Sequence, residues 1–156
     1  MKIIPFEKYE IRINRPSTEV VEIIGQNSEP WRLSYVFGAR TKPFLGSVDN
    51  NTFKIYRAIR YQNSFLPILD GVIENRGNES KLLITMRMPH FTSIFMLFWL
   101  GGTLLMALSG DENFRTPVSF VPWGLFLFGY VLMQGGFWLE VPRAKQLLEE
   151  TLGESS

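Results

Sequence analysis

Few side chains in this 156-residue chain have the type and spacing that catalysis or metal binding requires. His90 is the single histidine, and the absence of cysteine excludes disulfides, thiolate chemistry and cysteine-based metal sites. The carboxylates best placed for acid–base chemistry are Asp49, in a turn-like segment, and Asp70 and Glu74, which share one face of an expected strand. Turn chemistry and a solvated strand face explain these three, and capping of an apolar segment explains His90. The sequence therefore predicts a protein that is not an enzyme and holds no metal or cofactor.

A mixture of cations, aromatics and amides is the strongest candidate for a binding surface. It lies in residues 57–65, RAIRYQNSF, with two further cations in a nearby loop. Such side chains suit the headgroups of anionic lipids, although exposed strand ends and loops use them as well. Because the net charge is only +1 and no run of basic residues occurs, we expect no nucleic-acid partner. The candidate anionic-ligand surface consists of Arg40, Lys42, Arg57, Arg60 and Tyr61.

Two long apolar segments dominate the C-terminal half. Residues 91–108 and 118–139 contain no charged side chain, and each is about as long as the roughly 17–25 residues of a helix that crosses a bilayer. Both are apolar on all sides, so they predict a transmembrane hairpin rather than a surface helix of a soluble protein. Basic residues flank its outer ends at Lys81, Arg87, Arg143 and Lys145. By the positive-inside rule, we expect an integral membrane protein with both termini in the cytoplasm and membrane lipids as its surroundings.

Small residues within the two segments indicate where helices approach each other. The candidates for close packing are Gly101, Gly102, Gly124 and Gly129, together with Gln134 as the one strongly polar residue deep in a segment. Glycine lets helix backbones come close, and glutamine can hydrogen-bond to a neighbouring helix. These residues serve either packing within one hairpin or association with a second copy or a partner membrane protein. A transport pathway is not expected, because it normally carries ionisable residues.

The first 89 residues alternate between apolar and polar side chains as β-strands do. Residues 9–13 begin this pattern, and residues 17–26 interrupt it with the apolar stripe of a short helix. Further strands are expected at residues 31–37, 44–48, 52–60, 66–74 and 81–88. Turn-forming residues separate the last two pairs of strands and predict hairpins.

These patterns together predict three consecutive units. Residues 1–89 form an α+β domain, a small antiparallel sheet of about six strands with one inserted helix. Residues 90–141 contain the transmembrane hairpin. Pro142 is expected to mark a break, and residues 142–156 then form a short cytoplasmic helix and tail.

Short motifs in the second half of the sheet domain carry a resemblance. They are Phe44-Leu45-Gly46, Phe53-Lys54-Ile55, the segment RYQNSFLP at residues 60–67, and Asp70-Gly71. Followed by two spans, residues 44–139 resemble a group of small bacterial two-span membrane proteins of uncharacterised activity, which implies a bacterial inner membrane. The order of strand, helix, sheet and last helix is also similar to a helix-grip lipid-binding domain, although the hairpin before the last helix departs from that pattern.

Three functions remain open at this point. The first is a membrane-anchored, non-enzymatic interaction or regulatory protein that acts through its sheet or through association of its spans. The second is a binder of anionic lipid or a small hydrophobic ligand, which requires a pocket between the sheet and helix 17–26. The third, which has the least support, is a membrane-disrupting oligomer.

Overall fold

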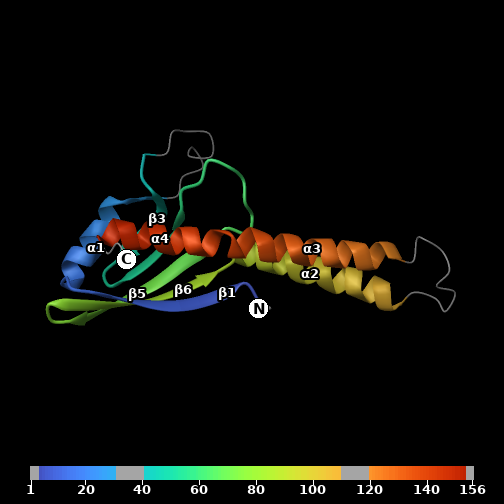
Figure 1. Cartoon of the computed structure of the whole chain (residues 1–156), viewed down its shortest axis with the longest axis horizontal. Helices are drawn as coiled ribbons and strands as arrows, with labels where there is room; N and C mark the ends of the chain where they lie inside the picture. Colours follow the sequence, from blue (N-terminus) through green and yellow to red (C-terminus); the bar gives the residue numbers. More distant parts are fainter. Residues whose placement is uncertain (1–3, 31–40, 110–119, 154–156) are drawn as a thin grey trace.

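The computed structural model describes residues 4–30, 41–109 and 120–153. These residues form an α+β structure in which a six-stranded sheet occupies one end and two long helices project from it (Figure 1). In chain order the elements are β1 (Phe6–Ile13), α1 (Ser17–Gln26), β2 (Ser28–Glu29), β3 (Phe44–Asp49), β4 (Thr52–Arg57), β5 (Ile68–Arg76), β6 (Glu79–Arg87), α2 (His90–Leu108), α3 (Val121–Trp138) and α4 (Glu140–Leu152). The α+β class and the early helix are therefore confirmed.

The sheet is mixed rather than wholly antiparallel, which corrects the prediction at one edge. Its strand order is β1-β6-β5-β4-β3-β2, and all neighbours are antiparallel except β2 and β3. β2 pairs through Ser28 and Glu29 alone, and two residues are too few to show the alternation that predicts a strand. The strand expected at residues 31–37 lies outside the described residues.

Two hairpins form the middle of the sheet at the places where turn residues predicted them. Between β3 and β4, Asn50 adopts a φ of +46°, a left-handed conformation that asparagine tolerates. Between β5 and β6, the turn consists of Gly77 and Asn78, with a φ of +78° at the glycine. Because this turn needs two residues rather than four, β5 and β6 each extend two residues further toward the turn than expected, whereas β5 begins two residues later and β6 ends one residue earlier. β4 is shorter and ends at Arg57.

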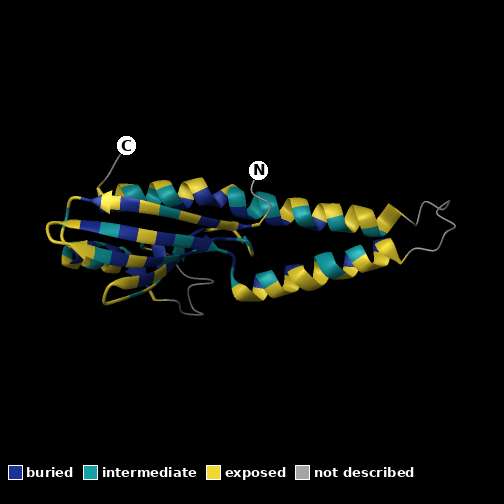
Figure 2. Ribbon diagram, turned by 90° about the horizontal axis from the view of Figure 1, so that it is seen from below, coloured by how far each residue is buried: buried dark blue, intermediate teal, exposed yellow. Residues whose placement is uncertain are grey.

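The main hydrophobic core lies between one face of the sheet and the helices α1 and α4 (Figure 2). Val20 and Ile24 of α1 and Leu148 of α4 are completely buried in it. The alternation in β6 is confirmed, since Leu82, Ile84 and Met86 all face this core. Truncating one such side chain to alanine typically costs about 2–5 kcal/mol. The sheet also contributes Ile13, Phe44, Phe53, Ile55, Leu69 and Ile73.

The helices α2 and α3 lie side by side (Figure 1). Many of their residues are exposed along the length of the pair (Figure 2), and these include large apolar residues. Phe91 is 83% exposed, Phe98 75% and Leu97 71%. By length and composition both helices are long and apolar enough to cross a membrane. Their bounds agree closely with the two apolar segments of the sequence.

α3 continues directly into α4, and this continuity corrects the break expected at Pro142 (Figure 1). Leu139, between them, keeps helical angles, with φ −70° and ψ −25°, and its N–H donates to the carbonyl of Gly135 at 3.2 Å. Pro142 therefore lies inside the continuous helix, where its missing N–H removes one backbone hydrogen bond. Val141 and Ala144, on either side of Pro142, are buried in the core, so packing holds the helix together across the proline.

Candidate functional site at the base of the helix pair

The loop of residues 58–67, between β4 and β5, ties the sheet to both long helices. Asn63 donates from Nδ2 to the carbonyl of Gly136 in α3 at 2.9 Å, and its Oδ1 accepts from the N–H of Phe65 at 3.0 Å. Thr92 in α2 donates from Oγ1 to the carbonyl of Ser64 at 2.8 Å. A Cβ on Gly136 would stand 2.6 Å from the Phe65 ring, so the glycine is what lets this ring lie against α3.

A buried carboxylate, Glu140, lies at the start of α4 beside this loop. It is 2% exposed, and it accepts hydrogen bonds from Arg57 Nη2, from the Tyr61 hydroxyl and, at 3.0 Å, from Arg143 Nη1. Arg57 also donates to the Tyr61 hydroxyl at 2.6 Å. The network at the base of α3 thus joins Arg57 of β4 and Tyr61 of the loop to two residues of α4, Glu140 and Arg143.

The network shifts the pKa values of its two acidic groups, the Glu140 carboxyl and the Tyr61 hydroxyl. Burial alone would raise the pKa of Glu140, but the hydrogen bonds from Tyr61 and Arg57 outweigh it and lower that pKa below its ordinary value. Desolvation raises the pKa of Tyr61, and the hydrogen bond to Glu140 adds to the rise. Glu140 is therefore ionised and Tyr61 protonated at neutral pH. An ionised carboxylate facing a guanidinium and a protonated phenol is a stable structural arrangement rather than a proton-transfer pair.

The structure brings together only part of the predicted anionic-ligand surface. Arg57 and Tyr61 meet, but Glu140 of the same chain occupies them. Lys42 lies elsewhere and donates to the carbonyl of Ser28 at 3.3 Å, and Arg60 is exposed on the loop. Arg40 lies outside the described residues. Sequence reasoning missed Glu140, although it is the first charged residue after the second apolar segment.

An apolar cavity of about 700 Å³ adjoins the same loop. Its polar lining includes Tyr61, Asn63 and Thr92 from the loop and from the first turn of α2. Its size lies within the range of about 300–1,000 Å³ that small-molecule sites occupy. The apolar part of the lining comprises Leu45, Ile59, Leu66, Ile68, Pro89 and Phe91.

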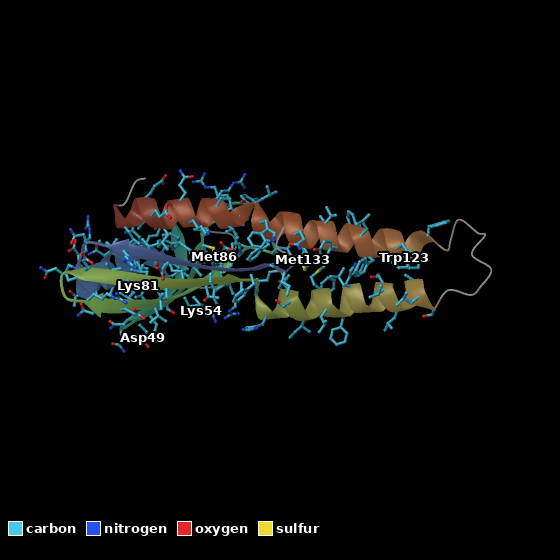
Figure 3. The ribbon with its side chains drawn as sticks, turned by 60° about the horizontal axis from the view of Figure 1, so that its bottom comes forward. Asp49, Lys54, Lys81, Met86, Trp123 and Met133 are labelled. Atoms are coloured by element: carbon cyan, nitrogen blue, oxygen red, sulfur yellow. The ribbon has the colours of Figure 1, made fainter. Side chains whose placement is uncertain are left out.

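The sheet face opposite the core is open and forms a trough of about 820 Å³. Asp49 and Lys54 point away from α4 on this side, whereas Met86 lies between the sheet and α4 (Figure 3). Val72, 47% exposed, and Leu83, 37% exposed, form an apolar patch among the charged residues. Those charged residues are Lys8, Glu10, Asp49, Lys54 and Asp70.

The carboxylates considered for acid–base chemistry do not converge. Asp70 accepts from Arg87 Nε at 2.6 Å, and Arg87 Nη1 lies 2.8 Å from Nε2 of His90. Glu74 lies 3.6 Å from Arg76, and Asp49 ends β3 at a turn. Among the described residues, no group of three or more histidine, aspartate or glutamate side chains is arranged to hold a metal ion.

The predicted packing residues of the two long helices fall into two groups. A Cβ on Gly129 would stand 2.6 Å from the Trp99 indole nitrogen, so this glycine lies in the α2–α3 contact. A Cβ on Gly101, Gly102 or Gly124 would meet nothing within 4 Å. These three glycines therefore leave open space on the surface of the pair.

Gln134 makes hydrogen bonds along its own helix. Its Nε2 donates to the Tyr130 hydroxyl at 2.8 Å, and its Oε1 accepts from the indole N–H of Trp138 at 2.7 Å. These bonds connect Tyr130, Gln134 and Trp138, which lie about one turn apart along α3 near the base of the helix pair.

No known protein family matches this chain, and no curated protein or solved structure is detectably similar to it.

Proposed function

We propose that this chain is a membrane-anchored, non-enzymatic interaction or regulatory protein of the bacterial inner membrane, with α2 and α3 across the bilayer. The outward apolar surface of the helix pair carries this proposal. Phe91, Leu97 and Phe98 are each more than two-thirds exposed. Burying one such side chain is worth about 1.5–3 kcal/mol, and lipid provides that burial all around the pair.

The open sheet face is the proposed interaction surface. α1 and α4 cover the opposite face, and no helix of the described residues covers this one, so we expect it to meet a partner protein. Val72 and Leu83 form an apolar centre there, and a charged rim surrounds them. A polar rim around an apolar centre is the usual composition of a protein-binding surface.

The membrane topology is tested by labelling from outside the cell. A reporter enzyme fused after Ser156 should be active in the cytoplasm, because the basic flanks favour that side. A single cysteine at Asn113, in a chain without other cysteines, should react with a reagent that does not cross the inner membrane. A C-terminal fusion that is active only in the periplasm would contradict the proposed topology.

The interaction surface is tested by site-specific photo-crosslinking in intact cells. A photoreactive residue at Leu83, on the open face, should give a discrete crosslinked protein product. The matched control is Glu22, an exposed residue on α1 at the covered side. An inserted protein that gives no product from position 83, or the same products from both positions, would refute this part of the proposal.

A ligand-binding function is the second candidate, and the cavity of about 700 Å³ beside the loop favours it. The space between α1 and the sheet does not, because Val20 and Ile24 fill it. Ser64→Phe would narrow the cavity and keep the backbone contact to Thr92. Saturable binding of a fluorescent fatty acid that this variant abolishes would support the second candidate, and binding that it leaves unchanged would contradict it.

A further inference from the structure

A second apolar groove runs between α2 and α3 on the side of β1. It encloses about 530 Å³ and begins where residues 4–6 cross the base of the helix pair. Met133 lies between the two helices at this level (Figure 3). The lining from the helices is almost wholly apolar and comprises Met96, Leu97, Leu100, Gly101, Leu104, Phe126, Tyr130 and Met133.

The polar side chains of the groove gather at its sheet end. Arg87, His90 and Ser93 line it there, at the N-terminus of α2. Among the described residues, Arg87 uses two of its five N–H donors, one toward Asp70 and one toward His90. Since arginine always donates, Nε2 of His90 is the acceptor in the second contact. A guanidinium with further donors and a helix N-terminus together favour a negatively charged group at this point.

The length of the groove corresponds to one leaflet of a bilayer. From Ser93 to Leu104 the axis of α2 rises by about 16 Å. Half of a hydrocarbon core of about 30 Å is about 15 Å. A ligand with its charge at Arg87 would therefore end near the middle of the membrane.

We propose that this groove binds one anionic phospholipid, with an acyl chain along α2 and α3 and the phosphate beside Arg87. The proposal rests on the proposed function in one respect, since it requires the helix pair to lie in a bilayer. A cation at one end and an apolar channel of leaflet length match the two parts of a phospholipid. A partner helix matches them less well, because residues 4–6 stand at the base of the groove and would obstruct a helix that continued toward the sheet.

The glycines of α2 provide a matched pair of variants for the acyl-chain site. Gly101 lines the groove and Gly102 does not, yet a Cβ at either position would meet nothing within 4 Å. Leucine at position 101 should therefore fill the groove without disturbing the helix contact, whereas leucine at position 102 should project elsewhere.

The probe is a phosphatidylglycerol with a photoreactive acyl chain, added to the full-length protein in phosphatidylcholine nanodiscs. In the wild-type protein the crosslinks should map to the groove, and unlabelled phosphatidylglycerol should compete. Gly101→Leu should reduce crosslinking about tenfold, which corresponds to about 1.4 kcal/mol of affinity. Gly102→Leu should leave it unchanged. Equal crosslinking in wild type and Gly101→Leu, or an equal loss in both variants, would overturn the proposal and indicate non-specific lipid contact.

The headgroup is tested by a double substitution, Asp70→Asn with Arg87→Gln, which removes the cation without leaving its carboxylate partner unpaired. It should abolish the preference for phosphatidylglycerol over phosphatidylcholine, and an unchanged preference would overturn the assignment of the phosphate to Arg87. If Gly101→Leu instead removed a crosslinked dimer, a second copy would occupy the groove and the lipid proposal would fail. Extraction by alkaline carbonate distinguishes failure of the proposed membrane anchor from failure of the proposed lipid site. A protein that alkaline carbonate washes off the membrane would refute the anchor. A protein that stays in the membrane but shows no effect of Gly101→Leu on lipid crosslinking would refute only the lipid site.

Discussion

Removal of the Glu140 carboxylate should destabilise the junction far more than removal of an exposed acid. The Glu140 side chain is 3% exposed and that of Arg57 is 20% exposed, so solvent screens their interaction weakly. In the variant Glu140→Leu, Arg57 would keep its charge with no acidic partner among the contacts of this network. Breaking a buried pair in this way typically costs about 3–5 kcal/mol. Because Arg57 is partly solvated, we expect the lower end, about 3 kcal/mol.

A double-mutant cycle separates the interaction energy of the Arg57–Glu140 pair from the energy lost through packing. Its variants are Glu140→Leu, Arg57→Met and the two together. The double variant leaves no unpaired charge between these positions, so its free energy of unfolding should lie closer to wild type than that of either single variant. The coupling energy should be at least about 2 kcal/mol. Arg15 and Glu19 are the control pair, since they are 40% and 45% exposed and should couple by only about 0.3–0.5 kcal/mol.

Guanidinium unfolding in mild detergent, followed by circular dichroism, gives these free energies. Trypsin provides a second measurement, because Arg60 is exposed in the loop that the network holds. Loss of Glu140 should speed cleavage after Arg60 under conditions where the sheet remains folded. A coupling no larger than that of the control pair, with unchanged cleavage, would refute the argument that this network holds the loop on the helices.

The remaining predictions concern pH and the sheet core. The pKa of Glu140 is lowered in the fold, so the ionised carboxylate stabilises the folded protein fully above the ordinary value of 4.5. This stabilisation is lost as the pH falls through the lowered pKa. Thermal melts should show this acid step in wild type and not in Glu140→Gln. Ile84→Asp places a carboxylate in a core position that is 2% exposed and should unfold the sheet, and a wild-type melting temperature would contradict the inward assignment. Gly71→Ala would put a Cβ 2.0 Å from the Phe53 ring and should lower the free energy of unfolding by about 1–3 kcal/mol. Adding Phe53→Leu to this variant should recover part of the loss, and chemical denaturation would measure both changes.

The sequence predicts those parts of the fold that depend on local periodicity. β6 alternates through Leu82, Ile84 and Met86, and one buried face of a sheet requires that alternation. The two hairpins follow from residues that accept positive φ, as Asn50 and Gly77 do. The long helices follow from their uniform apolarity, which needs no knowledge of neighbours.

The parts that the sequence does not predict depend on contacts between distant segments. Arg57 and Glu140 are 83 positions apart, and no local pattern links a strand end to a helix start. Pro142 normally indicates a helix end, but here the buried residues of α4 hold the helix through it. Glycine spacing likewise does not show that Gly129 faces Trp99 while Gly101 faces a groove, because that depends on how the two helices are rotated.

The continuity of α3 and α4 has a mechanical consequence for the proposed function. α4 is fixed to the sheet core by Val141, Leu148 and Leu152, and it is the same helix that enters the proposed membrane. The loop of residues 58–67 adds contacts to both α2 and α3, so the sheet is held to the helix pair at more than one point. A flexible linker would let the sheet rotate freely beneath the bilayer. In the proposed membrane arrangement, this junction would instead present the open sheet face in one orientation relative to the bilayer, which would favour recognition of a partner that is itself held at the membrane surface.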